Sequence, residues 1–366
     1  MYHRLFAALT PLFARALADQ TFPGAAVGVS RRQGAVRQDC LFCFGRQRFG
    51  PSRAVDFRTC YDLASLTKPL ATTLCIFSLI KAGSLDLTTQ AQEILKDRRL
   101  DNLSGVTILD LLNHRSGLAP YHQFFHELST IHDQHLRDEL LAIISRLPVD
   151  KPEDRRQRYS DIGFILLGMI CEQVSGLPLD LYAQKYLYSP INLQERIFFN
   201  RCGRRREADY APTEERGLSG ESLSGQVHDE NAALLGGVAG HAGLFGDIGG
   251  VLELVVLILE LVQGRREHPH LAAADLRRAV ARREADGTWG LGFDTRSATG
   301  SSSGEYFSEA SFGHLGFTGT SFWVDPERNL AVVLLSNRVH PRRDNLQIKE
   351  FRPRFHDAVM RAVLRG

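Results

Sequence analysis

The chain of 366 residues carries little net charge and contains no long uncharged apolar run. Lysine and arginine total 44 and aspartate and glutamate total 42, which leaves a formal net charge of +2. Such a balance offers no basic field for nucleic acid. The longest apolar candidate, Val251 to Val262, is short for a bilayer span and contains two glutamates. We therefore expect no nucleic-acid partner and no membrane span. The charged run Arg201 to Arg206 is interpreted as a solvated loop.

Cysteine is also scarce, with six in the whole chain. Cys75 and Cys171 fall in apolar helical runs, where a free thiol behaves as a small buried hydrophobe. Cys40 and Cys43 lie three apart in a strand-like run, so their side chains face opposite sides and cannot share a metal ion. We predict reduced thiols, which favours a cytoplasmic location. A periplasmic or secreted location is left open.

No metal-binding motif is complete. His122 and His126 are four apart on an expected helix, but Glu127 follows the second histidine. The zinc-protease order His-Glu-x-x-His is therefore absent, and an exposed helical face explains the same residues. We predict neither a metal nor another cofactor, and the sequence does not give the oligomeric state.

The N-terminal segment has two interpretations. Arg4, the apolar run that follows it and Ala16-Leu17-Ala18 imitate a secretory signal peptide. However, Leu5, Leu9 and Phe13 recur at helical spacing, and Arg15 interrupts the run. We favour an amphipathic helix.

A serine and a lysine three residues apart, Ser65 and Lys68, stand between an extended stretch and an apolar helical run. Residues three apart share one helix face, which brings the amine beside the hydroxyl. A serine hydroxyl needs a neighbouring base to become a nucleophile. A lysine that is partly desolvated can lose its proton and serve as that base. We predict that Ser65 is the nucleophile.

Two other serine patterns compete with this one. Ser78-Leu79-Ile80-Lys81 repeats the spacing inside an apolar helix, where the serine cannot stand at a helix start. Gly300 to Gly304 fits Gly-x-Ser-x-Gly but lacks the preceding strand and following helix that this elbow needs. We interpret the first as ordinary helix and the second as a loop.

Two later motifs complete a recognisable order. Arg158-Tyr159-Ser160-Asp161 precedes an apolar helix, and Gly313 to Thr320 leads into an alternating strand. With Ser65-Leu66-Thr67-Lys68, they resemble the three motifs of the serine β-lactamase and penicillin-binding-protein superfamily, in particular its class C and esterase branch. The resemblance extends from about Phe22 to the last helix.

This resemblance implies an α/β (α+β) fold in which an antiparallel sheet is flanked by helices and carries an inserted all-helical subdomain. We expect a single catalytic domain, residues 1–366. Its α/β part covers about 1–62 and 285–366, and its helical part about 63–284.

The resemblance also implies roles for individual residues. Ser65 would form an acyl-enzyme, Lys68 would accept its proton, and Tyr159 would act as a second proton relay. The N–H groups of Ser65 and Phe317 would form the oxyanion hole. The expected substrate-binding residues are Asp161, His314, Gly316, Thr318, His228 and His241.

Two departures from the family pattern bear on the substrate. His314 stands where β-lactamases carry the lysine that helps to hold a substrate carboxylate, and Asp161 stands where they carry asparagine. Both changes predict weak β-lactamase activity. A narrower resemblance, in Val227 to Asn231 and Gly236 to Gly246, is to low-molecular-mass penicillin-binding carboxypeptidases and muropeptide amidases.

We therefore expect an amidase or peptidase that acts on cell-wall muropeptides through Ser65. A carboxylesterase of the class C type is the first alternative, because the catalytic parts are the same. A catalytically weak protein that binds peptidoglycan fragments is the second.

Periodicity predicts the elements that carry these motifs. Helices are expected at 66–81, 107–113, 136–147, 162–174, 251–262 and 346–364. Strands are expected at 22–31, 40–47, 290–294, 305–312, 320–325 and 330–336.

Overall fold

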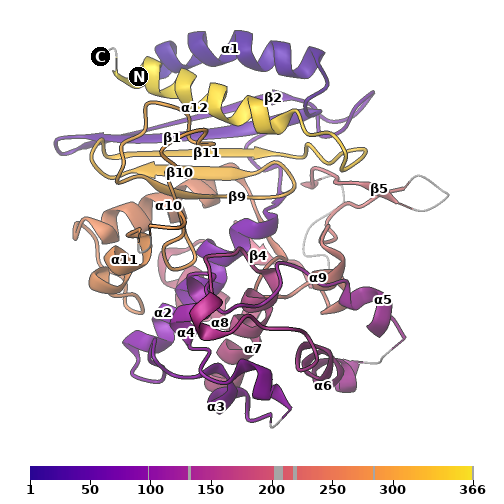
Figure 1. The fold of residues 1–366 in the computed structure, drawn as a ribbon. Helices are drawn as coiled ribbons and strands as arrows, with labels where there is room; N and C mark the ends of the chain where they lie inside the picture. The colour runs from indigo at the N-terminus through magenta and orange to yellow at the C-terminus, as the bar shows by residue number, and fades with distance from the viewer. Residues whose placement is uncertain (98, 131–132, 202–208, 217–220, 283–284, 365–366) are drawn as a thin grey trace.

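The structure is a computed structural model that describes residues 1–97, 99–130, 133–201, 209–216, 221–282 and 285–364. Figure 1 shows the arrangement of the helices and strands. The α-helices are α1 (Tyr2–Ala18), α2 (Thr73–Lys81), α3 (Ala91–Leu95), α4 (Ile108–Leu112), α5 (Phe124–Leu128), α6 (Asp133–Ile144), α7 (Asp161–Ser175), α8 (Leu179–Ala183), α9 (Glu230–Leu234), α10 (Ile248–Val262), α11 (Ala273–Val280) and α12 (Ile348–Leu364).

The main sheet is antiparallel and draws its strands from both ends of the chain. Its order is β2-β1-β11-β10-β9-β8. The strands are β1 (Gly24–Gln33), β2 (Val36–Gly45), β8 (Asp294–Thr295), β9 (Phe312–Leu315), β10 (Ser321–Asp325) and β11 (Leu330–Ser336). A smaller sheet joins β3 (Tyr61–Asp62), β7 (Leu244–Gly246) and β4 (Ile197–Phe199), and β5 (Glu215–Arg216) pairs with β6 (Glu221–Ser222).

Strand β11 is buried on both faces, which explains its uninterrupted apolar sequence. Leu330, Val332 and Leu334 pack into the core on one side of the sheet. Ala331 and Val333 pack into the core on the other side. The alternation follows from the two-residue period of a strand. Helices must therefore cover both faces.

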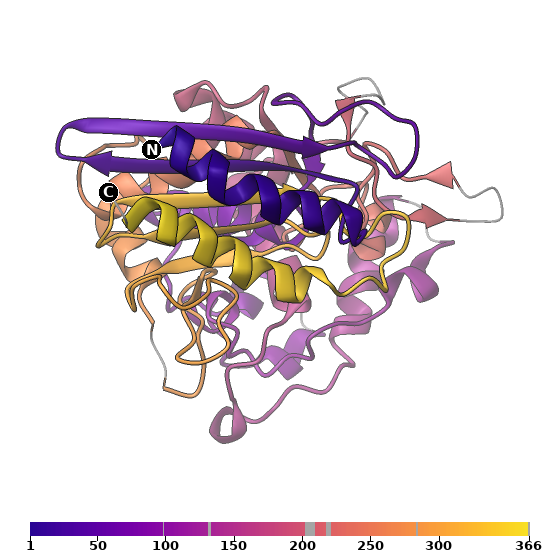
Figure 2. The same cartoon turned by 90° about the horizontal axis from the view of Figure 1, so that it is seen from above.

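The first and last helices cover one face. Figure 2 shows α1 and α12 lying side by side across the sheet. The face of α1 that carries Leu5, Leu9, Phe13 and Ala16 is buried, and the ring of Phe13 stacks on Phe44 of β2 at 4.1 Å between centroids. The amphipathic helix expected at the N-terminus is confirmed.

Helix α10 covers the opposite face and links the sheet to the helical part (Figure 1). Asp247 caps its N-terminus by accepting a hydrogen bond from the N–H of Gly250 at 2.8 Å. Helix α7 is the buried centre of the helical part and is capped in the same way by Ser160. This cap fixes Asp161 as the first residue of α7 and Tyr159 immediately before it.

Two expected strands are wrong. The segment 305–311 is a loop because side chains take its N–H groups: Glu305 N–H donates to Asp357 and Ser308 N–H to Asp325. Strand β9 begins only at Phe312. Around 290–294, the backbone turns through Gly292 (φ +76°), so that the strand is confined to Asp294–Thr295.

The helix expected at 66–81 is instead a 3-10 helix (Ala64–Leu66), a π-helix (Lys68–Thr72) and then α2. The remaining expected elements are present within a few residues of their predicted bounds. In the described part of the chain, no single helix is long and apolar enough to cross a membrane; α7 and 179–191 reach that length and composition only as a pair, bent by 73°. Cys40, Cys43, Cys75 and Cys171 are free thiols. Arg204 to Arg206 lie outside the described residues, whereas Arg201 pairs with Asp180. The division into α/β and helical parts at the predicted boundaries stays a prediction.

Candidate active site

Ser65 lies in a tight turn between β3 and α2. It is the middle residue of a 3-10 helix, Ala64–Leu66, and the preceding Ala64 adopts a left-handed conformation (φ +46°). An alanine in this region is strained, and such strain persists only where the surroundings impose it. Asp62 accepts a hydrogen bond from Ala64 N–H at 2.8 Å, and Thr67 Oγ1 donates to the Ala64 carbonyl at 2.7 Å.

A short π-helix, Lys68–Thr72, follows the serine turn. Its second residue is Pro69, which has no N–H to donate to the Ser65 carbonyl. π-helical turns of this kind occur frequently at functional sites. Here the turn presents Lys68 to Ser65, and α2 begins only at Thr73.

The ammonium group of Lys68 is fully buried, makes two hydrogen bonds and forms one ion pair. Its Nζ donates to Ser65 Oγ at 3.1 Å and to the His241 carbonyl at 3.0 Å. It also lies 2.7 Å from a carboxylate oxygen of Asp161.

The charges around Lys68 determine its protonation. Burial alone would lower the pKa of Lys68, but the Asp161 carboxylate and the Tyr159 phenol outweigh burial and raise it. Burial raises the pKa of Tyr159 to about 12, although the nearby Lys68 charge opposes that rise. In the free protein Lys68 is therefore a cation and Tyr159 a neutral phenol. Lys68 must therefore give up a proton before it can serve as the base that the sequence predicts.

Two backbone N–H groups can stabilise an oxyanion near Ser65. The Ser65 N–H belongs to the first turn of its 3-10 helix, where N–H groups have no acceptor within the helix. The Phe317 N–H makes no backbone hydrogen bond within the described residues. In the same peptide unit, the Gly316 carbonyl accepts a hydrogen bond from Arg352 at 2.7 Å. Because a trans peptide points its N–H opposite to its carbonyl, Arg352 fixes the direction of the Phe317 N–H.

A cavity of about 600 Å³ opens in front of these groups. Its wall includes Ser65, Tyr159 and Asp161, together with Gly316 and Phe317 of the third motif. Acidic and basic side chains both line the cavity, and two of them, Glu230 and Arg343, form an ion pair. The remaining lining residues are Ala64, Pro120, Tyr121, His228, Asp229, Glu230, Ala242, Leu315, Arg338, Arg343, Leu346, Ile348, Lys349 and Arg352.

Of the expected substrate-binding residues, three lie behind the cavity wall. His314 is 1 % exposed and packs against Trp289 and Tyr159. Burial, then the Lys68 charge, lower the pKa of His314 to about 3, so it is neutral. Thr318 is buried and donates to the Asp62 carbonyl at 2.7 Å. His241 is buried and bonds through Nε2 to Asp229 at 2.8 Å. These side chains can position the wall but do not line it.

His228, by contrast, does line the cavity. Its ring stacks on Phe317, with 5.7 Å between centroids, and its Nε2 lies 3.2 Å from a carboxylate oxygen of Glu214. Burial, followed by the charges of Arg216 and Arg343, lowers the pKa of His228 to about 4. The imidazole is thus neutral at neutral pH.

Sequence reasoning missed two organising residues. Asp62 is buried and accepts hydrogen bonds from the N–H groups of Ala64 and His228, which ties the serine turn to the cavity wall. His114 has a left-handed backbone (φ +60°) and accepts a hydrogen bond from Ser160 N–H at 3.1 Å. Its ring lies 4.7 Å from that of Tyr159. For Asp62, the sequence signal that could have predicted its role was its position three residues before Ser65.

The competing motifs lie elsewhere. Ser78 is buried in α2 and exchanges a hydrogen bond with the Tyr182 hydroxyl at 3.0 Å. Ser302 lies in a loop with no flanking strand and helix, as its elbow would require. His122 bonds to Glu127 at 2.6 Å. Among the described residues, no group of three or more histidine, cysteine, aspartate or glutamate side chains could hold a metal ion.

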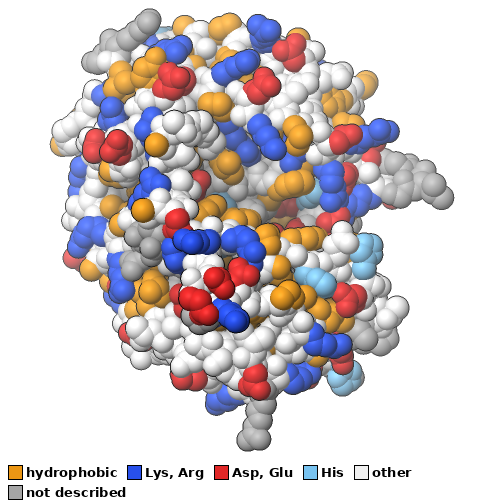
Figure 3. Space-filling model, in the orientation of Figure 1, with side chains coloured by type: hydrophobic (Ala, Val, Ile, Leu, Met, Phe, Trp, Pro, Cys, Tyr) orange, Lys and Arg blue, Asp and Glu red, His pale blue; other side chains and the backbone are white. Residues whose placement is uncertain are grey.

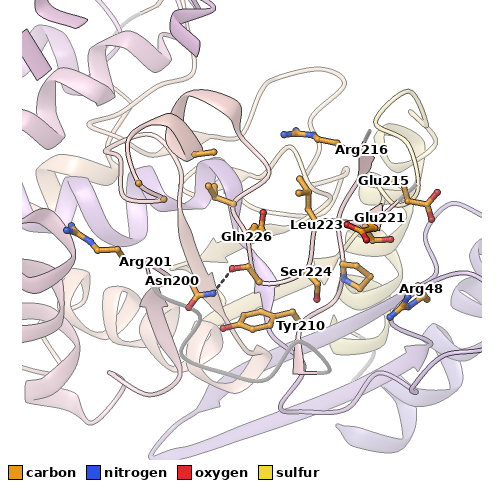
Figure 4. Close-up of a pocket in the computed structure, with 17 residues that line it drawn as sticks. Arg48, Asn200, Arg201, Tyr210, Glu215, Arg216, Glu221, Leu223, Ser224 and Gln226 are labelled. Atoms are coloured by element: carbon orange, nitrogen blue, oxygen red, sulfur yellow. Dashed lines mark hydrogen bonds between the residues drawn. The ribbon is translucent and has the colours of Figure 1, made fainter. Parts of the chain in front are cut away.

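A second cavity, of about 980 Å³, does not include Ser65 in its wall. Its wall is polar and includes Tyr210, Gln226 and Asn200, whose side chain donates to the Gly225 carbonyl (Figure 4). Its lining residues Arg201, Arg216 and Glu221 are next in sequence to 202–208 and 217–220, which are outside the described residues. None of the three sequence motifs contributes to it.

The family model described as Beta-lactamase matches residues 9–352. The chain belongs to the beta-lactamase family. It is 30% identical to the N-acetylmuramyl-L-alanine amidase of Bacillus subtilis (strain 168), over 87% of this chain and 78% of that protein. It is 31% identical to a putative D-alanyl-D-alanine carboxypeptidase of Escherichia coli (strain K12), over 77% of this chain and 70% of that protein.

Solved structures support the fold of this family member. EstCE1, a hydrolase with promiscuous acyltransferase activity, matches with a TM-score of 0.76 at 19% identity and covers 98% of this chain and 99% of its own. A class C beta lactamase from Rhodobacter sphaeroides matches with a TM-score of 0.74 at 18% identity, over 97% and 99%. The family and these relatives identify the protein as a hydrolase of the beta-lactamase fold, and the expected family and fold are confirmed.

Proposed function

We propose that this protein is a serine amidase or peptidase that cleaves amide bonds in cell-wall muropeptides through an acyl-enzyme on Ser65. The observation that carries the proposal is the contact of 3.1 Å between Ser65 Oγ and Lys68 Nζ at the wall of a cavity. The names of the relatives, a muramyl-alanine amidase and putative D-alanyl-D-alanine carboxypeptidases, support the substrate class.

Acylation begins when Ser65 Oγ attacks the scissile carbonyl carbon. Because Lys68 and Tyr159 are both protonated in the free protein, their group must first release one proton. It then accepts the Ser65 hydroxyl proton as the carbonyl oxygen becomes an oxyanion. The N–H groups of Ser65 and Phe317 donate to this oxygen. When the C–N bond breaks, Tyr159 returns the proton to the leaving amine.

Deacylation reverses these roles. A water molecule attacks the ester carbonyl and gives a proton to the same group. The group returns this proton to Ser65 Oγ as the bond from the carbonyl carbon to Ser65 Oγ breaks. A carboxylic acid and the free hydroxyl of Ser65 result. Each step moves one proton and balances without a metal or a redox partner.

A carboxylesterase is the second candidate. The cavity wall includes Leu315, Phe317, Leu346 and Ile348, and an apolar wall of this kind suits the acyl chain of a simple ester. Protonation of the leaving group is also less important for an ester than for an amide, because an alcohol leaves more readily than an amine. The same Ser65 chemistry would serve both substrates.

The test compares defined muropeptides, short-chain p-nitrophenyl esters and nitrocefin with the purified protein, and Ser65→Ala as control. We expect cleavage of a muropeptide amide bond and weak or no hydrolysis of nitrocefin. A fluorophosphonate should label Ser65, located by mass spectrometry. Hydrolysis of esters alone would favour the second candidate, and equal turnover by Ser65→Ala would refute both.

A further inference from the structure

Two buried arginines in the active-site cavity lack a carboxylate partner. Arg338 and Arg352 line the cavity and are 4 % and 6 % exposed. Neither forms an ion pair with a described acidic residue. Their acceptors are main-chain carbonyls: Arg338 donates to those of Phe317, Arg343 and Asn345, and Arg352 to those of Gly316 and Thr320.

Arg343, the third arginine of the cavity wall, does have carboxylate partners. Arg343 donates to both carboxylate oxygens of Glu214, at 2.8 and 2.9 Å from Nε, and to Glu230. Its charge is therefore neutralised inside the protein. Burying a cation without such a partner is costly, so a compensating anion is expected where one is missing.

The guanidinium groups of Arg338 and Arg352 both have N–H donors without a hydrogen-bond acceptor in the described part of the chain. Nη2 of Arg338 and Nη1 of Arg352 have no acceptor among the described residues, and Nε of Arg352 is buried without one. Burial lowers the pKa of Arg338 to about 10 and that of Arg352 to about 9. Both remain cations at neutral pH.

The two arginines flank the oxyanion hole. Arg352 holds the Gly316 carbonyl at 2.7 Å and Arg338 holds the Phe317 carbonyl at 2.8 Å, on either side of the Phe317 N–H. The Arg338 guanidinium also covers the Phe317 ring at 4.4 Å. A group bound here would lie next to a carbonyl that Ser65 attacks.

We propose that Arg338 and Arg352 form a carboxylate subsite that selects substrates with a carboxylate within about three bonds of the scissile carbonyl. In a leaving amino acid, the bonds C–N, N–Cα and Cα–C bring its carboxylate to about 4 Å from that carbonyl carbon. Guanidinium groups recognise carboxylates by paired, charge-assisted hydrogen bonds. The subsite would thus provide the charge that His314, neutral and buried, does not.

This subsite rests on the proposed amidase function and narrows it to acyl amino acids with a free carboxylate. The substrate carboxylate could lie on the amine side or on the acyl side of the scissile bond, and the test includes one compound for each position. N-acetyl-alanine carries it on the amine side, and succinyl-alaninamide carries it three bonds away on the acyl side. N-acetyl-alaninamide lacks it and is the neutral reference.

Release of the amine is measured by mass spectrometry for the wild type, Arg338→Gln, Arg352→Gln and Arg342→Gln. Arg342 is exposed and outside the cavity wall, so its variant removes the same charge as a matched control. We expect the wild type to prefer a carboxylate substrate about 10- to 100-fold over the neutral reference in kcat/KM. Arg338→Gln and Arg352→Gln should reduce this preference towards one, mainly through KM, and Arg342→Gln should retain it.

Arg352→Gln also removes the hydrogen bond that holds the Gly316 carbonyl, so it can disturb the oxyanion hole. Arg338→Lys provides a second variant, because it keeps the charge and loses the paired donors. An intermediate preference in Arg338→Lys supports the subsite. An unchanged preference in both Arg338 variants would overturn it.

A binding arm separates the subsite from the amidase proposal. Calorimetry on Ser65→Ala compares the affinities of N-acetyl-alanine, succinyl-alaninamide and N-acetyl-alaninamide, with and without Arg338→Gln. If the wild type cleaves none of them but a carboxylate ligand binds tighter through Arg338, the amidase proposal fails and the subsite stands. If neither carboxylate ligand binds tighter than the neutral one, the subsite is refuted.

Discussion

Lys68 Nζ and Asp161 Oδ1 lie 2.7 Å apart in a pair whose lysine is fully buried. The second motif of the family has asparagine at the position of Asp161, which would leave the ammonium without a counter-charge. Here the carboxylate raises the pKa of Lys68 against the effect of burial. Catalysis then requires that the group Ser65, Lys68, Tyr159 and Asp161 lose or redistribute one proton before Ser65 attacks.

This pair predicts the pH dependence of activity. If Asp161 keeps Lys68 protonated, Asp161→Asn removes the charge that raises the pKa of Lys68, and the amine loses its proton at lower pH. The acid limb of the kcat/KM profile should then move to lower pH, which assays from pH 5 to pH 10 would detect. Asp150→Asn is a suitable control, since Asp150 pairs with Arg158 near the protein surface. A limb that moves to higher pH would show that Asp161 itself accepts the proton.

The nucleophile prediction compares three serines. Ser65→Ala should lower kcat by about 10⁴-fold or more, because no other hydroxyl occupies its place. Ser78→Ala and Ser302→Ala should retain most activity. Ser78→Ala should also lower the free energy of unfolding by about 1 kcal/mol, because the Tyr182 hydroxyl loses its partner. Turnover rates and urea unfolding measure both effects, and an active Ser65→Ala protein would contradict the mechanism.

The proton relay is tested by a double-mutant cycle. Lys68→Ala and Tyr159→Phe should each lower kcat on the order of 10²-fold or more, because both groups handle the same proton. The double variant should then be little worse than the worse single variant. Additive losses would instead place the two residues in separate steps.

The local motifs made the nucleophile, the lysine and the tyrosine predictable. Ser65 and Lys68 are one helical turn apart in the sequence, and Tyr159 immediately precedes the Ser160 cap that fixes α7. Helices and the long strands were predictable for a similar reason, since periodic burial leaves a pattern in the sequence. The short strand β8 leaves too few residues for such a pattern.

The other features of the site depend on tertiary contacts and could not be predicted from the sequence. Arg338 and Arg352 face the cavity because the end of β11 and helix α12 meet at the third motif, and sequence spacing does not record that meeting. His314 was expected to line the substrate wall, but the packing of Trp289 and Tyr159 covers it. Burial of a single side chain depends on neighbours from distant elements, which a motif does not specify.

A buried histidine in α12 predicts how stability depends on pH. His356 is fully buried, and its Nδ1 donates to the Ser302 carbonyl at 2.7 Å. Burial, with a contribution from the Arg352 charge, lowers the pKa of His356 to about 3. The unfolded chain, with a pKa near 6.5, therefore binds a proton that the folded protein excludes. The stabilising effect is complete above about pH 6.5 and is lost as the pH falls towards 3.

We expect His356→Gln, which can still donate to the Ser302 carbonyl, to make the protein less sensitive to acid. Urea unfolding of both proteins at pH 7.5 and pH 5 gives four free energies. Between these pH values the wild type should lose about 2 kcal/mol more than the variant, the linkage expected for one histidine with these two pKa values. The difference between the two proteins at pH 7.5 gives the effect of the substitution on packing. This difference is subtracted from the difference measured at pH 5. Equal losses in the two proteins would show that His356 takes up its proton without unfolding, and that its site is open to water.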